Sequence, residues 1–183
     1  MSLLLNKNSF LNMKLRIFLI VFIFSSSSLF AQQGQGKKQA PVLHEVSNKD
    51  VVQSVFPEAV KVDKFNDYWF KILDEKGKTL GFALSSLPYC KDVIGYNNTT
   101  PVMIITDKKF VIQKTAILTN WETLGYVRKL EKMGFFDLWK GKKLKEAGEV
   151  QLDAYTGATK TAIAVGKNID FLLANASKKL PKH

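Results

Sequence analysis

Two pairs of β-favouring runs, each pair joined by a short polar turn, constrain the fold of this chain more than any other feature. Asp74-Glu75-Lys76-Gly77-Lys78 separates the runs of the first pair, and Asp107-Lys108-Lys109 separates those of the second. Turns this short join antiparallel neighbours, because a parallel crossover needs a dozen or more residues. The sequence therefore predicts an antiparallel sheet built from hairpins, with strands at residues 68–73, 79–85, 102–106 and 110–118.

Helical patterns precede and follow these hairpins. Ser47 or Asn48 can cap a short helix over the valines that follow, and Pro57 ends it. From Thr161 to Ala176, apolar side chains recur at helical spacing, which predicts an amphipathic helix. The predicted fold class is α+β, an antiparallel sheet built from hairpins with this C-terminal helix packed on it.

The first 31 residues have the pattern of a signal peptide. They contain no acidic residue, and three basic residues precede the apolar run 17–24. This run is shorter than the ~20 residues of a membrane-spanning helix. We therefore predict cleavage after Ala31 and a soluble, periplasmic or secreted mature protein, whereas an uncleaved segment would anchor the protein in the membrane. Translation can begin at Met1 or at Met13.

The remaining chain, about 150 residues, is long enough for one domain with its own hydrophobic core. Residues 32–46 begin with a Gln, Gly and Lys segment that predicts a flexible tether. Residues 47–94 hold the first helix and hairpin and form the N-terminal part of the domain. Residues 95–178 are predicted to form the core of the functional domain.

The chain is basic, with a formal net charge of +11. Without residues 1–31 it keeps 24 Lys and Arg against 16 Asp and Glu, a net charge of +8. Such a charge can steer the protein to an acidic partner or an anionic membrane surface, and the alternative is a solvated surface of dispersed lysines. The lysine pairs are not interleaved with aromatic residues, so a nucleic-acid partner is not predicted.

Few residues are available for metal or hydrolytic chemistry. His44 and His183 are the only histidines, and they lie near the tether and at the last position. No metal site and no catalytic Ser-His-Asp triad is therefore predicted. Cys90 is the only cysteine, so no internal disulfide can form. We expect a half-buried structural thiol at Cys90, the alternative being a redox-active one.

The run Asp153-Ala154-Tyr155-Thr156-Gly157-Ala158-Thr159-Lys160-Thr161 leads directly into the predicted C-terminal helix. Gly157 and Ala158 leave the backbone open to close approach, and a hydroxyl follows where the N–H groups of a new helix concentrate partial positive charge. A phosphate group is the ligand that this arrangement favours. The alternative is an ordinary helix cap, in which Thr156 or Thr159 accepts a backbone N–H bond.

This run resembles the flavinylation signature of the FMN-binding domain family. The family includes the C subunit of sodium-translocating NADH:quinone reductase, the G subunit of Rnf complexes and NosR-type regulators. In that family an FMN transferase esterifies the phosphate of FMN to the last hydroxyl of the motif, which implies covalent FMN at Thr159. The resemblance covers residues 95–178, where Gly95-Tyr96 and Glu122-Thr123-Leu124-Gly125 look like the family's layout.

The resemblance also implies which residues contact the cofactor. Glu122 to Gly125 are expected to line the isoalloxazine ring, although Leu124 stands where the family usually has Pro and Asn97-Asn98 where it often has Gly. Asp153 is assigned to helix capping or to recognition by the transferase, because a carboxylate repels a phosphodiester. The residues expected to contact FMN are Thr159, Thr156, Gly157, Ala158, Thr161, Tyr155, Glu122, Thr123, Leu124 and Gly125.

The function that this interpretation implies is that of an exported electron carrier, which exchanges electrons with a membrane or soluble partner protein and has no catalytic residues of its own. Two alternatives remain at the level of the sequence. One is a non-redox extracytoplasmic binding or sensory module in which the motif is only a helix cap. The other is a flavin-dependent oxidoreductase with its own small substrate.

Overall fold

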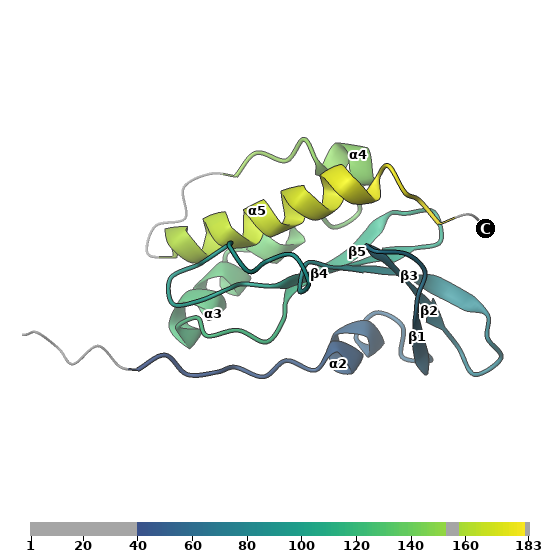
Figure 1. Cartoon of the computed structure of the whole chain (residues 1–183), viewed down its shortest axis with the longest axis horizontal. Helices are drawn as coiled ribbons and strands as arrows, with labels where there is room; N and C mark the ends of the chain where they lie inside the picture. Colours follow the sequence, from purple (N-terminus) through teal and green to yellow (C-terminus); the bar gives the residue numbers. More distant parts are fainter. Residues whose placement is uncertain (1–39, 153–157, 182–183) are drawn as a thin grey trace, which may run out of the picture. The chain divides into compact units, whose positions relative to one another are not determined.

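The computed structural model describes residues 40–152 and 158–181 and shows an α+β fold (Figure 1). Five antiparallel strands form one sheet in the order β1-β2-β3-β4-β5, so each strand pairs with its neighbour in sequence. The predicted hairpins are confirmed as β2–β3 and β4–β5. The strands are β1 (Lys61–Lys64), β2 (Trp69–Leu73), β3 (Thr79–Ser85), β4 (Val102–Asp107) and β5 (Ile112–Ile117).

Both predicted helices are present. Helix α2 (Asn48–Gln53) begins after Ser47, whose hydroxyl accepts the Asp50 N–H bond, and α5 (Thr159–Ala176) is the C-terminal helix. Strand β1 and three helical segments were not predicted. Strand β1 is short, charged and largely exposed, features that suit an edge strand and hide it from a hydrophobic pattern. The unpredicted helical segments are α3 (Leu124–Lys132), the 3₁₀ turn η1 (Phe135–Asp137) and α4 (Leu144–Ala147).

Helices α5 and α2 lie on opposite sides of the sheet (Figure 1). On the α5 side, buried side chains of the sheet such as Trp69, Phe82 and Ile104 share one core cluster with Ile169 and Leu172. The Trp69 indole N–H also donates to the carbonyl of Ala176, 3.1 Å away, at the end of α5. A smaller cluster on the other face joins Ile72, Ala83 and Met103 to the valines of α2. The alternation of side chains along each strand therefore divides the core between the two faces.

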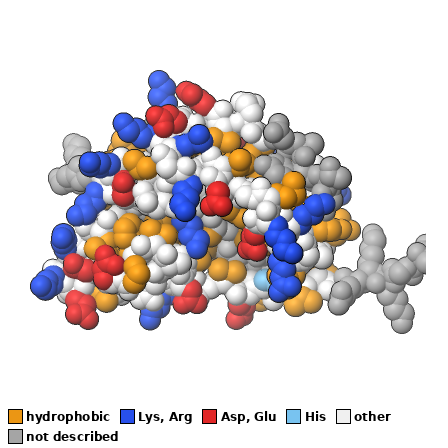
Figure 2. Space-filling view, turned by 180° about the vertical axis from the view of Figure 1, so that it is seen from behind, with side chains coloured by type: hydrophobic (Ala, Val, Ile, Leu, Met, Phe, Trp, Pro, Cys, Tyr) orange, Lys and Arg blue, Asp and Glu red, His pale blue; other side chains and the backbone are white. Residues whose placement is uncertain are grey.

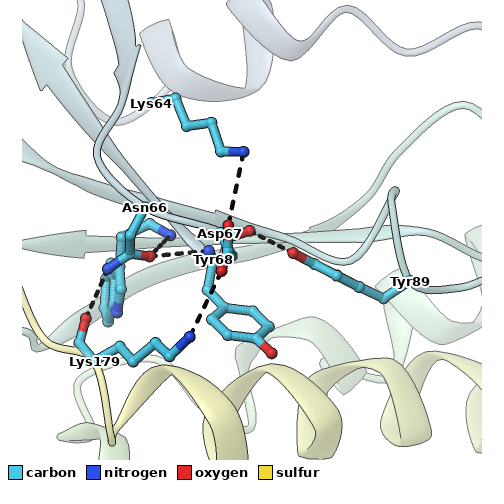
Figure 3. A network of polar contacts seen from close by, with 7 residues as sticks. Lys64, Asn66, Asp67, Tyr68, Tyr89 and Lys179 are labelled. Atoms are coloured by element: carbon cyan, nitrogen blue, oxygen red, sulfur yellow. Dashed lines mark hydrogen bonds and ion pairs between the residues drawn. The ribbon is translucent and has the colours of Figure 1, made fainter.

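A polar network fastens the turn between β1 and β2 to the C-terminal end of the domain (Figure 3). Asn66 accepts the Trp69 N–H bond at 3.0 Å and donates to the Lys179 carbonyl at 2.9 Å. The Tyr89 hydroxyl donates to the Asp67 carbonyl at 2.6 Å, and the ammonium of Lys179 lies 3.6 Å from the Asp67 carboxylate. The backbone contacts hold the turn in place, whereas exposed ion pairs of this kind contribute little stability.

On the face shown in Figure 2, Lys and Arg side chains are interspersed with Asp and Glu side chains instead of gathering in one patch. On this face, the distribution agrees with the interpretation of the lysines as a solvated surface. Within residues 40–152 and 158–181, no helix has the length and apolar character needed to cross a membrane.

Candidate functional site

The predicted attachment residue lies at the start of α5. Thr159 is the first residue of this 18-residue helix and is exposed. Ala158 occupies the N-cap position, where its methyl side chain cannot accept a hydrogen bond from the first turn. The helix dipole places partial positive charge at this end of α5. The first turn contains no acidic residue that would balance this charge. The other predictions for this motif fall on Asp153, Tyr155, Thr156 and Gly157. These four residues lie outside the described residues.

A surface cleft of about 240 Å³ opens beside Thr159. Two tyrosines from distant parts of the sequence form its aromatic wall: the rings of Tyr96 and Tyr126 meet edge to face, with centroids 5.2 Å apart. The ammonium of Lys160 lies 5.9 Å from the centroid of the Tyr96 ring, within range of a cation–π interaction. The cleft thus combines flat apolar surfaces, a cation and a helix N-terminus. Its lining residues are Tyr96, Tyr126, Ala158, Thr159, Lys160 and Thr161.

A buried carboxylate joins the two sides of this cleft. Glu122 is fully buried, and its oxygens accept the backbone N–H bonds of Tyr96 and Asn97 at 3.0 Å. The Thr161 hydroxyl, in the first turn of α5, donates to the same carboxylate. The side-chain carbonyl of Asn120 accepts the Glu122 N–H bond at 3.0 Å and holds the residue in this orientation. Glu122 therefore connects the loop that carries Tyr96 to the helix that carries Thr159.

Gly95 permits this close approach. A Cβ atom at position 95 would lie 2.7 Å from a carboxylate oxygen of Glu122 and 2.7 Å from the Thr100 methyl group. Any other residue would push the loop away from Glu122. The two residues of the Gly95-Tyr96 pair thus have different roles. Gly95 lets the backbone approach the Glu122 carboxylate, and Tyr96 forms part of the cleft wall.

The neighbours of Glu122 lie outside the cleft lining. Thr123 is at the N-cap position of α3, but its side chain makes no capping bond. The hydroxyl of Thr123 instead lies 3.4 Å from the Asn97 side-chain amide. Leu124 is 40% exposed, and a Cβ atom at Gly125 would have no atom within 4 Å. The assignment of this segment to the isoalloxazine ring stays a prediction, with Glu122 turned inward and the next residues facing outward.

Cys90 is 2% exposed and thus more deeply buried than the sequence predicts. Its thiol is 3.5 Å from the Leu87 carbonyl, and burial raises the pKa of the thiol above its ordinary value. A raised pKa keeps the sulfur protonated and unreactive at neutral pH. Cys90 is also absent from the lining of the cleft beside Thr159, so it is not part of this site.

The residues predicted from sequence to contact FMN did not include Tyr96, Tyr126 or Lys160. Lys160 directly follows Thr159, so its position in the motif was a usable signal. No local pattern pairs Tyr96 with Tyr126, because 30 residues separate them and only the folded chain brings them together.

Comparison with known proteins bears on the same region. Residues 95–174 match the sequence model of the FMN-binding domain family, a range that contains every residue of the cleft. This part of the chain is therefore similar to FMN-binding domains. The crystal structure of Shewanella oneidensis NqrC is similar at 19% sequence identity, covers 73% of this chain and 77% of its own, and gives a TM-score of 0.39. No curated protein matches the sequence.

The described residues fit a phosphorylated flavin. The N-terminus of α5, where Ala158 makes no side-chain capping bond, and Lys160 both border the cleft, so a phosphate would find positive charge there. The tyrosine rings supply flat surface of the type that an aromatic cofactor contacts. The Thr159 side chain at the cleft provides a hydroxyl that can form a phosphoester.

Proposed function

We propose that this protein is an exported electron carrier whose FMN is esterified through its phosphate to Thr159. The observation that carries the proposal is the position of Thr159: it is exposed, begins α5 and borders the aromatic cleft of the FMN-binding domain. FMN, when bound, supplies the redox chemistry, and the protein supplies attachment, orientation and charge. An FMN transferase would form the bond.

The electrostatics of the cleft favour a phosphodiester at this position. Such a group keeps one negative charge, which the N-terminal dipole of α5 stabilises by up to about 1 kcal/mol at an exposed site. Lys160 adds a full positive charge beside the same hydroxyl. Thr159 is the first residue of α5, with Ala158 at the cap position, whereas Thr156, the other residue of the capping alternative, lies outside the described residues.

The size of the cleft supports covalent attachment. At about 240 Å³ it is smaller than the roughly 300–1,000 Å³ of pockets that bury most of a drug-sized ligand. A flavin held here would keep part of its ring at the surface. Deep pockets retain a cofactor by burying it, whereas here a covalent bond would prevent dissociation. An exposed ring edge also suits electron transfer to a partner protein, whether membrane-bound or soluble.

Purification with an active FMN transferase tests the proposal against its alternatives. A yellow protein that accepts and donates electrons only with a partner present is the expected result. A colourless, unmodified protein would support the non-redox binding module. A yellow protein that turns over a small substrate without a partner would support the oxidoreductase.

Exchange of Tyr96 for leucine tests where the isoalloxazine ring lies. We expect Tyr96→Leu to shift the absorbance spectrum and the reduction potential of the flavin while the covalent bond remains, because the variant removes one aromatic wall of the cleft. Gly125→Val is the matched comparison, since its added side chain meets open space on α3. A change in Gly125→Val together with an unchanged Tyr96→Leu would place the ring over Glu122 to Gly125 and not in the cleft.

Export is a separate prediction that rests on residues 1–31. The charged start and the short apolar run predict a mature chain that begins near Gln32 and is found outside the cytoplasm. N-terminal sequencing of protein from the periplasmic and membrane fractions measures this directly. A membrane-bound chain that retains residues 17–24 would identify an anchored carrier instead of a soluble one.

A further inference from the structure

Strand β5 is an edge of the sheet, and part of its backbone faces away from β4. Leu118 donates its N–H bond to the Pro101 carbonyl at 2.8 Å, so these two form a hydrogen-bonded pair. Bonded and non-bonded pairs alternate along an antiparallel ladder, which makes Thr115↔Ile104 and Ile117↔Val102 non-bonded pairs. The N–H and C=O groups of Thr115 and Ile117 therefore point outward. Within the described ranges, no hydrogen bond outside the ladder reaches either amide.

The chain itself extends this edge at both of its ends. Ile112 exchanges backbone bonds with the segment 141–142, at 2.8 and 2.9 Å, and Asn120 exchanges two with His44, at 2.7 and 3.0 Å. Between these contacts lies a groove of about 400 Å³, with Thr115 and Ile117 along its floor. We call this space the edge groove. Its apolar lining includes Val46, Val51, Val127 and Phe136, and its charged lining consists of Lys114, Glu131 and Asp137.

The shape and charge of the edge groove indicate its occupant. The groove takes its lining from residues on both sides of β5 in the sequence as well as from the strand itself, which favours a single extended segment over a second sheet edge. The net charge of +8 that remains without residues 1–31 opposes association with a second copy. A single extended segment can enter and pair with the outward backbone groups. Lys114 also lines the groove, but its ammonium donates to the Ser54 hydroxyl at 2.8 Å. Neither Glu131 nor Asp137 has a salt bridge to any described residue, so a basic side chain would complement these two carboxylates.

We propose that the edge groove binds an extended peptide segment of a partner protein as a sixth strand, with a basic side chain beside Glu131 and Asp137. Main-chain bonds to Thr115 and Ile117 supply affinity, as in other cases of strand addition, and the walls select alternate side chains. The groove lies on residues that the flavin cleft does not use, so the proposal stands independently of covalent FMN.

The probe for this proposal is a fluorescein-labelled, end-capped peptide of sequence Val-Lys-Val-Lys-Val, titrated against the full-length protein by fluorescence anisotropy. We expect saturable binding that is at least about tenfold tighter than for Val-Glu-Val-Glu-Val, because like charges would face Glu131 and Asp137. Bound peptide should slow hydrogen exchange at the Thr115 and Ile117 amides by about tenfold or more and leave the ladder-bonded Ala116 amide unchanged. Absence of binding, or binding without protection of these two amides, would overturn the proposal.

Two variants sharpen the test. Thr115→Pro removes an outward N–H group without removing a ladder bond, so it should weaken peptide binding about tenfold, while Thr115→Val keeps the N–H group and should bind normally. Circular dichroism and thermal unfolding check that both variants fold. In the paired variant Glu131→Gln/Asp137→Asn, which leaves the strand intact, the preference for the basic peptide should disappear. Normal binding by a folded Thr115→Pro, or an unchanged charge preference in the paired variant, would contradict strand addition in this groove.

Discussion

Thr159→Ala is expected to abolish covalent flavin, so that protein exported together with an active FMN transferase is colourless after denaturation. The wild-type protein should remain yellow in denaturant, because a phosphoester, unlike packing, does not depend on the fold. Intact-mass measurement should show wild-type protein heavier by the mass of FMN minus water, and Thr159→Ala at its unmodified mass. The effect is complete loss, because position 159 provides the hydroxyl that forms the bond.

Two control variants separate the bond from the turn around it. Thr159→Ser keeps a hydroxyl at the first residue of α5 and should retain the modification. Thr156→Ala should at most weaken modification, because Thr156 belongs to the motif but is not the residue predicted to carry the bond. A wild-type chain that stays unmodified beside an active transferase would exclude the covalent carrier, and modification of Thr159→Ala would move the bond to another hydroxyl.

Glu122→Ala is expected to lower the free energy of unfolding by roughly 3 kcal/mol, since removal of a buried acceptor leaves the Tyr96 and Asn97 N–H groups unsatisfied. The loop that carries Tyr96 should also separate from α5, so the flavin spectrum should change in the same variant. Chemical denaturation measures the first effect and absorbance the second. Glu75→Ala, in the exposed turn between β2 and β3, is the matched control and should change stability by less than about 0.5 kcal/mol.

Thr161→Val tests the same buried contact from the helix side. It keeps the side-chain shape but removes the donor to Glu122, which should cost about 1–2 kcal/mol. In a double-mutant cycle, Glu122→Ala and Thr161→Val should be non-additive, because they share one hydrogen bond. Additive effects, or a Glu122→Ala variant as stable as Glu75→Ala, would show that the carboxylate does not connect the loop and the helix.

The elements predicted from sequence are those whose signals are local. Both hairpins follow from β-favouring runs around short turns, and α5 follows from apolar side chains at helical spacing over 18 residues. Strand β1 has no such signal, because only its pairing with β2 makes Lys61–Lys64 a strand. Helix α3 was not predicted, because its buried residues, Val127 and Leu130, are too few to reveal the helix without the core they enter.

The sequence by itself determined the chemistry at the start of α5: a hydroxyl, small residues before it and a cation after it, all within one contiguous run whose geometry follows from the helix that it begins. Tertiary structure decided what surrounds that hydroxyl. Tyr96 and Tyr126 meet only because β4 and β5 return the chain to α5, and Glu122 turns inward only because the Tyr96 loop and Thr161 together satisfy its carboxylate. A buried charge requires partners from several segments at once, and such partners are not encoded in any one stretch of sequence.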